Sequence, residues 1–132
     1  MSKIHDNEII SYEVDLKNQK IIIHTQYNSS TLIEKTDIVF SNVLAHYFEN
    51  QLQGSIIFDI EEYEIIQFIE DNSDLLKKQK NYCWPMDYDT VEELAEILLK
   101  EQYSYYVITS SYGLSGWVVS KKYETEDYTP LK

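Results

Sequence analysis

The sequence predicts an α+β fold, in which a mainly antiparallel sheet of about five or six strands carries two principal helices packed on it. Three observations favour this class. Runs of alternating apolar and polar residues lie towards both ends of the chain, two central segments place apolar residues at helical spacing, and short polar or glycine-containing turns separate the runs. A chain of 132 residues matches one ordinary domain, so residues 1–132 are expected to fold around a single core.

The first two strands are expected at residues 10–16 and 21–27. Ile10, Tyr12 and Val14 alternate with polar residues in the first run, and Ile21 and Ile23 open the second run with the same period. Because successive side chains of a strand point to opposite faces, this pattern buries one face and leaves the other in water. The polar residues 17–20 between the runs therefore predict a β-hairpin.

The central part of the chain combines strands and helices. Residues 36–40 and 54–60 are predicted strands, whereas residues 42–50 fit either strand or helix. Apolar residues among acids predict an amphipathic helix over residues 61–72, which the polar residues 72–74 then break. A second helix begins after Thr90, because Thr90 and Glu93 have the spacing of a capping box, and it is expected to end near Lys100.

The last part of the chain predicts a second hairpin. Residues 103–110 and 117–121 are rich in residues that favour strands, and the segment between them contains Gly113 and Gly116. The polar tail that follows contains Pro130 and is expected to fray from about residue 124.

The composition of the chain indicates which class of partner it binds. The formal net charge is -12, from 23 acidic residues against 11 lysines and no arginine, and there are twelve tyrosines. Arginine is the side chain best suited to bidentate capture of phosphate and carboxylate, so its absence argues against nucleic acid and acidic substrates. The electric field of such a chain instead favours a basic partner.

The sequence also favours a cytoplasmic location without a membrane. The N-terminal residues lack the apolar core of a signal peptide, and no segment approaches the roughly 20 apolar residues that span a bilayer. The lone Cys83 cannot form an intramolecular disulfide, which agrees with a reducing compartment.

Acidic residues concentrate in two blocks, and these are the first candidates for contact with a basic partner. The chosen acids are Glu61, Glu62, Glu64, Asp87, Asp89, Glu92, Glu93 and Glu96. The alternative interpretation is a merely solvated helix face. The functional interpretation draws support from repulsion between like charges three or four positions apart on a helix, which docking against lysines and arginines would relieve.

Aromatic residues supply candidate anchors for the same partner. Tyrosine and tryptophan are enriched among the residues that dominate binding energy, and Tyr82, Trp84 and Tyr112 stand in predicted loops. For Trp117, which lies in a predicted strand, packing in the core of the last hairpin is the favoured alternative.

No catalytic, cofactor-binding or metal-binding residue is predicted. The sequence from Gly113 to Gly116 lacks the spacing of a nucleophile elbow, and the three histidines, His5, His24 and His46, belong to no metal-binding pattern. Cys83 is expected to be a buried or inert thiol. An enzyme stays a third-ranked alternative, which would require a cleft where a histidine or Cys83 meets a carboxylate.

Four segments of the chain, residues 43–50, 58–63, 81–85 and 110–118, resemble a family of small acidic proteins from Gram-positive bacteria. This family is similar to the immunity proteins encoded beside polymorphic or contact-dependent toxins. The resemblance implies a cytoplasmic protein that binds and neutralises a cognate toxin domain, often a basic nuclease, and has no activity of its own. It implies no catalytic residues.

Together, charge and resemblance predict a non-enzymatic, antitoxin-like protein that covers a basic toxin domain with an acidic, aromatic-containing surface. Two other classes of binding stay open. The first is a small-ligand-binding module with an aromatic pocket around Trp84 and Trp117. The second is a homodimer formed by pairing of hairpin edges.

Overall fold

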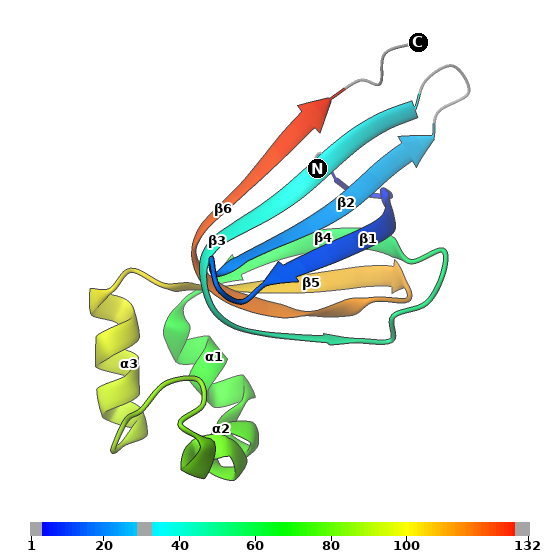
Figure 1. The fold of residues 1–132 in the computed structure, drawn as a ribbon. Coiled ribbons are helices and arrows are strands. Elements are labelled where there is room, and N and C mark those ends of the chain that lie inside the picture. Colours follow the sequence, from blue (N-terminus) through cyan, green and yellow to red (C-terminus); the bar gives the residue numbers. More distant parts are fainter. Residues whose placement is uncertain (1–3, 29–32, 129–132) are drawn as a thin grey trace.

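Six antiparallel strands close into a barrel in the order β1-β2-β3-β6-β5-β4 (Figure 1). The computed structural model describes residues 4–28 and 33–128. The strands are β1 (Glu8–Asp15), β2 (Lys20–Asn28), β3 (Ile33–Glu49), β4 (Ile56–Tyr63), β5 (Ser104–Tyr112) and β6 (Ser115–Tyr128). The predicted α+β class with a mainly antiparallel sheet is therefore confirmed, and its strands form a barrel.

Both predicted hairpins form, β1 with β2 and β5 with β6. In the first hairpin a β-bulge between Ile9 and Ser11 shifts the alternation by one residue. Ile9 consequently faces the core, whereas Ile10, expected on the buried face, is 51% exposed. A bulge places two residues opposite one and turns the side chains that follow, which strict alternation cannot anticipate.

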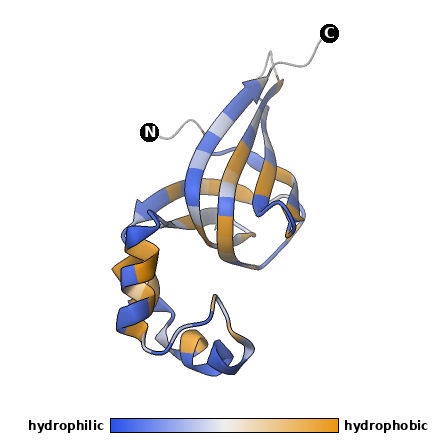
Figure 2. Ribbon diagram, turned by 60° about the vertical axis from the view of Figure 1, so that its left-hand side comes forward, coloured by the Kyte–Doolittle hydropathy of each residue, from blue (hydrophilic) through white to orange (hydrophobic). Residues whose placement is uncertain are grey.

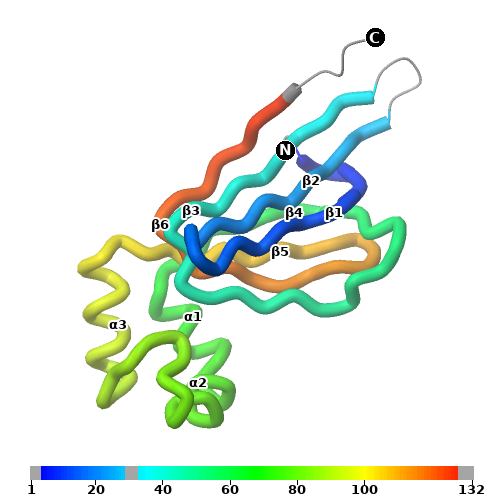
Figure 3. Tube along the Cα trace, viewed as in Figure 1, coloured from blue at the N-terminus to red at the C-terminus, as the bar shows by residue number. Residues whose placement is uncertain are grey.

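The ambiguous residues 42–50 fall almost wholly in β3, a strand of 17 residues with two arms. The first arm, residues 33–41, pairs with both β2 and β6, and the second arm, residues 43–49, pairs with β6 alone. Asn42 between them has a positive φ of 54°, and the register of the β3–β6 ladder shifts just after it. The strand thus bends as it leaves one side of the barrel for the other (Figure 3).

Residues 124–128 were predicted to fray, and this is wrong. They pair with the first arm of β3 as the end of β6, where the Thr36 hydroxyl donates to the Asp127 carboxylate at 2.8 Å. Polar composition marks this segment as exposed, but backbone pairing with β3 gives its N–H and C=O groups partners. The rest of the predicted tail, residues 129–132, lies outside the described residues.

Three short helices are inserted between β4 and β5, where two were predicted. They are α1 (Ile65–Asp71), α2 (Ser73–Gln79) and α3 (Val91–Lys100), and a single 3-10 turn, η1 (Lys80–Tyr82), follows α2. The three gather at one end of the barrel (Figure 1). α1 starts later than predicted because residues 61–63 pair with β5 as the end of β4. The predicted break at residues 72–74 is a single residue, Asn72, whose side-chain amide donates to the Phe68 carbonyl at 3.0 Å before α2 begins.

The second predicted helix, α3, is confirmed together with its cap. The Thr90 side chain accepts a hydrogen bond from the Glu93 backbone N–H at 3.2 Å, which satisfies one of the free donors of the first turn. Leu94, Ala95 and Leu98 are buried on one face of the helix. The last-turn Lys100 lies near the negative end of the helix dipole.

Two apolar clusters stabilise the molecule, one inside the barrel and one between the barrel wall and the helices. Successive side chains of β5 and β6 point to opposite faces of the barrel wall, so these strands contribute to both clusters. Tyr106 and Val118 belong to the inner cluster, whereas Tyr105 and Trp117 belong to the outer one. Hydrophobic and hydrophilic segments are interspersed along the strands of the barrel (Figure 2). Trp117 is only 7% exposed, so the expectation that it packs in a core is confirmed.

No helix in the described part of the chain is long and apolar enough to cross a membrane.

Candidate functional site

The predicted acids occupy two places at the helical end of the molecule. Glu61 and Glu62 lie in the last part of β4 and Glu64 precedes α1, so the first group is not on a helix as expected. The second group runs from the loop after η1 into α3 and consists of Asp87, Asp89, Glu92, Glu93 and Glu96. All eight side chains are exposed.

The first group is partly engaged by neighbouring hydroxyls. Ser104 donates to the Glu62 carboxylate at 2.7 Å, and Tyr63 donates to Glu61 at 2.9 Å. The hydrogen bond to Glu61 raises the pKa of Tyr63, because ionising the phenol would place two negative charges together. A hydroxyl carries no positive charge, so neither contact pairs a carboxylate with a cation.

Glu64 and the second group have no cationic partner in the part of the chain that the structure describes. Within residues 4–28 and 33–128, the carboxylates of Glu64, Asp87, Asp89, Glu92, Glu93 and Glu96 form no ion pair and no side-chain hydrogen bond. Lys100 lies four residues after Glu96 on α3 but forms no ion pair with it among the described residues, Lys80 donates to the Tyr88 carbonyl and lies over the Tyr88 ring, and Lys121 pairs with Glu101 at 3.4 Å. The result is an acidic surface whose carboxylates form no ion pair with any described residue, which we call the acidic face: Glu61, Glu62, Glu64, Asp87, Asp89, Glu92, Glu93 and Glu96.

The predicted aromatic anchors are split by the fold. Tyr82 stands in η1 with 78% of its surface exposed, on the same insertion as the acidic face. Trp84 is half-buried and packs on Trp117, with ring centroids 6.1 Å apart. Tyr112 is 54% exposed, as expected for a turn, but it ends β5. Since a strand rises about 3.3 Å per residue, the nine residues of β5 carry Tyr112 well away from the helices that precede it.

An apolar cavity of about 510 Å³ opens between the barrel wall and the helical insertion. Trp117 and Tyr47 stack in its wall at 6.4 Å between ring centroids, and Leu75 of α2 faces them. The remaining lining residues are Glu49, Asn72, Val107, Ile108, Thr109, Ser115 and Gly116. The aromatic pocket expected around Trp84 and Trp117 is therefore built differently, because Trp84 does not line this cavity and Tyr47 does.

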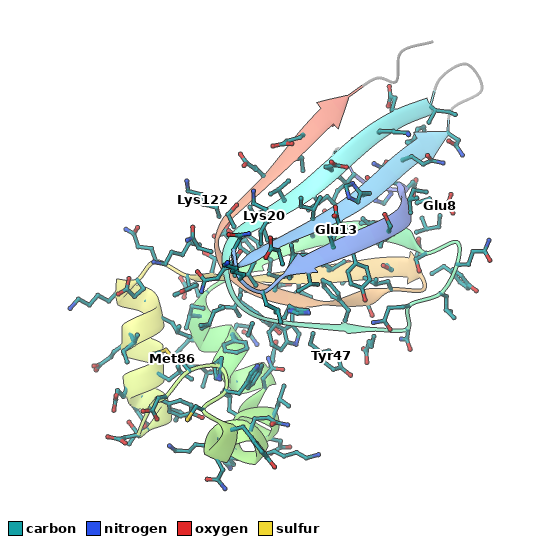
Figure 4. All side chains as sticks on the ribbon, in the orientation of Figure 1. Glu8, Glu13, Lys20, Tyr47, Met86 and Lys122 are labelled. Carbon is teal, nitrogen blue, oxygen red and sulfur yellow. The ribbon has the colours of Figure 1, made fainter. Side chains whose placement is uncertain are left out.

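Sequence reasoning missed Tyr47 because residues 42–50 fitted either strand or helix. Only the pairing of Tyr47 with Trp117 across the β3–β6 ladder brings the two rings to one wall. Figure 4 labels Tyr47 on the second arm of β3. If residues 42–50 had been assigned to a strand, the period of two would have placed Ala45, Tyr47 and Glu49 on one face, and Tyr47 could have been considered as a wall residue.

Three strands place a histidine between two carboxylates on the outside of the barrel. His24 Nε2 lies 2.6 Å from Glu13, and its Nδ1 lies 2.8 Å from Asp37. The hydrogen bonds to Glu13 and then to Asp37 raise the pKa of His24, because both ring nitrogens can donate only in the imidazolium form. His24, Glu13 and Asp37 do not line the cavity beside Trp117 or the two clefts along β1. Because both ring nitrogens of His24 already have carboxylate partners, these three residues serve to link neighbouring strands, and we call them the His24 clamp.

The other candidate reactive groups stand apart. Of the expected buried or inert thiol, the buried alternative is wrong, because Cys83 is exposed; it caps η1 with a positive φ of 56°. His46 is half-buried, and burial lowers its pKa. Over the described ranges, no group of three or more histidine, cysteine or acidic residues has the arrangement of a metal site.

The chain matches no protein-family profile, no curated protein and no solved structure.

Proposed function

We propose that this protein is a non-enzymatic, cytoplasmic immunity protein, which binds and neutralises a cognate toxin domain of basic, nuclease-like character. The observation that carries the proposal is the acidic face: eight exposed carboxylates, six of them without a side-chain partner in residues 4–28 and 33–128. Leaving such charges together costs stability through repulsion, and a basic partner removes that cost on binding.

Complementary charge acts first on the encounter. A negative surface steers a positive partner and raises the association rate, to as much as about 10⁸–10⁹ M⁻¹s⁻¹ at low salt, with a steep fall as salt screens the charges. Exposed Tyr82 lies on the same insertion and supplies an apolar contact that becomes desolvated on docking. Tyr112 belongs to a different end of the barrel, so the proposed interface is centred on the helices.

Capture of the partner tests this proposal. Tagged protein is incubated with native cytosol, and with lysate from cells that express the C-terminal domain of the neighbouring gene's product, at low and at high salt. The proposal expects a basic domain that is retained at low salt, released at high salt and non-toxic when bound. Retention of an acidic or neutral protein that ignores salt would contradict it.

A second candidate function is supported by the cavity beside Trp117. Its volume of about 510 Å³ is within the range of small-molecule sites, and aromatic and aliphatic side chains make up much of its wall. In this case the protein would bind an apolar or aromatic small molecule. Tryptophan fluorescence should then shift on addition of such compounds, and Tyr47→Ala should abolish the shift while Tyr82→Ala leaves it intact.

A further inference from the structure

The barrel is closed through a single short contact between β1 and β4. Their ladder contains one residue pair, Glu8 with Ile56, and the flanking hydrogen bonds join Ile9 to Ser55 and Ile57 to Asn7. Beyond Ile9, β1 pairs with β2 only. In the described part of the chain, residues 10–15 thus form a strand edge whose second side has no strand partner.

The second arm of β3 forms the opposite side of this opening. Residues 44–49 pair with β6 alone, and the last bond to the β1–β2 hairpin is that of the Val43 N–H to the Gln19 carbonyl at 2.8 Å. Tyr12 and Phe48 touch across the opening, with ring centroids 5.0 Å apart. The Gln51 amide lies there too, at 3.3 Å from both the Tyr12 hydroxyl and the Phe48 carbonyl.

The contact between Tyr12 and Phe48 leaves a cleft on either side. The larger, of about 480 Å³, runs along residues 8–12 of β1 and the loop residues 51–54, and we call it the edge cleft. The smaller, of about 150 Å³, lies by the hairpin turn. Ile10 and Leu52 line the edge cleft, and each is 51% exposed. An unpaired strand edge and exposed aliphatic side chains therefore occur together.

These features match the way in which one protein adds a strand of another to its sheet. Main-chain hydrogen bonds to a free edge supply affinity, and the pockets beside the edge select alternate side chains. Residues 10–12 of β1 both line the edge cleft and lie on the free edge, so about three residues of an extended segment can pair there, at roughly 3.3 Å each. A rounded small molecule would leave the backbone edge unpaired.

The charged side chains around the edge cleft indicate which residues an incoming strand should carry. Every charged side chain on β1 and on the second arm of β3 is a carboxylate, namely Glu8, Glu13, Asp15 and Glu49. Glu8 lines the edge cleft itself, and Figure 4 labels Glu8 and Glu13 along β1. A second copy of this chain would oppose acids with acids, whereas lysines or arginines on an incoming strand would be attracted.

We propose that the edge cleft is a second protein-binding site, at which a short extended segment of a partner, alternating aliphatic and basic residues, adds a strand to β1. The site is separate from the acidic face and does not depend on the immunity function. It requires only that a partner present such a segment.

The test uses the isotopically labelled full chain and the capped pentapeptide Lys-Val-Lys-Val-Lys as probe. Nuclear magnetic resonance titration should shift the amide signals of residues 10–12 and 51–54 and slow amide exchange at the β1 edge. Two matched peptides serve as controls: one with N-methylated backbone amides, which cannot pair as a strand, and one with glutamates in place of lysines. Both should bind at least about tenfold more weakly, since one lacks the ladder bonds and the other is repelled.

Variants locate the site. Ile10→Lys and, in the loop, Leu52→Lys should each weaken peptide binding about fivefold or more, because each removes an aliphatic wall and adds a like charge. Ile66→Lys on α1 is the matched control, since Ile66 is 48% exposed and lies outside the edge cleft, and it should change nothing. Equal binding of the N-methylated or the glutamate peptide would overturn the proposal. So would signal shifts confined to the Trp117 cavity, or a concentration-dependent dimer that perturbs the β1 edge without peptide.

Discussion

His24 is the residue whose chemistry is most clearly set by the fold. Its two carboxylate partners come from neighbouring strands, Glu13 from β1 and Asp37 from β3, and each engages a different ring nitrogen. Facing pairs across strands stabilise a sheet. In this one, a single titratable side chain joins three consecutive strands of the barrel.

The raised pKa of His24 gives a pH-dependent contribution to stability. Because the folded-state pKa lies above the unfolded value near 6.5, the contribution is complete below about pH 6.5 and is lost as pH rises through the folded-state pKa. Since Glu13 is largely exposed, we expect at most about 1 kcal/mol. The free energy of unfolding, measured against pH for the wild type and for His24→Gln, should converge at high pH and separate at low pH. Parallel curves would contradict this assignment.

Gly116 lies where the backbone of β6 closely approaches that of β3. A Cβ built there would lie 1.9 Å from the Tyr47 carbonyl oxygen, which belongs to backbone and cannot swing aside. Gly116→Ala should therefore destabilise by more than about 2 kcal/mol, in the range of severe core changes. Gly54→Ala is the control, because Gly54 has a positive φ of 83° but open space around it. Its cost should be about 1 kcal/mol, and chemical denaturation of both variants compares them.

At the level of elements, α3 combines a good cap with an unfavourable distribution of charge. Thr90 satisfies the Glu93 N–H, and Glu92 and Glu93 lie in the first turn, where the helix dipole favours them. Glu96 lies one turn later, four residues after Glu92 and three after Glu93, in a position to repel both. The cap belongs to folding, whereas Glu96 is repelled by these two carboxylates and attracted only by Lys100, four residues later.

Removal of the cap should be costly. Thr90→Ala is expected to lower the free energy of unfolding by about 1 kcal/mol, since it leaves a first-turn N–H without its side-chain acceptor. Ser73→Ala at the start of α2 provides the comparison, because the N-terminus of α2 has no side-chain cap. Urea titration should show a clearly smaller effect for Ser73→Ala, and equal effects would mean that the Thr90 hydrogen bond contributes nothing.

Neutralising Glu96 should act in the opposite direction. Glu96→Gln removes two repulsions and the attraction to Lys100, each of about 0.2–0.5 kcal/mol, so it should stabilise the fold by a net of about 0.2–0.5 kcal/mol, while it weakens binding to a basic partner. Thermal unfolding and partner affinity are measured on the same variant. A loss of stability would show that this carboxylate serves the fold, and the acidic face would lose its main argument.

For the whole molecule, local signals were enough to predict the hairpins, the capped helix and the exposure of Tyr112. They failed wherever a distant partner decides the outcome. Glu61 and Glu62 look helical in sequence, but pairing with Val107 and Tyr106 of β5 holds them in a strand. Residues 124–128 look like a tail until the first arm of β3 pairs with them. The bulge at Ile10 and the positive φ of Asn42 are local interruptions of strand geometry, which sequence periodicity does not encode.

The candidate sites show the same division. The acids of the acidic face could be chosen from the sequence because charge needs no partner to be recognised. The stacking of Tyr47 on Trp117 and the His24 clamp could not, since each joins residues that are remote in sequence and adjacent only across a ladder.

The central claim, neutralisation of a basic toxin domain through the acidic face, is tested most directly by survival of cells that express the neighbouring gene's C-terminal domain together with this protein. The wild type is compared with the triple variant Glu92→Gln, Glu93→Gln and Glu96→Gln. A second triple variant, Glu34→Gln, Glu124→Gln and Glu126→Gln, removes the same charge from exposed positions on β3 and β6.

The account predicts survival with the wild type and with the β3–β6 variant, and a loss of protection with the α3 variant at equal protein levels. If the α3 variant protected as well as the wild type, or if the two triple variants failed alike, the acidic face would not be the site of neutralisation. If the wild type itself gave no protection, the immunity function would be wrong.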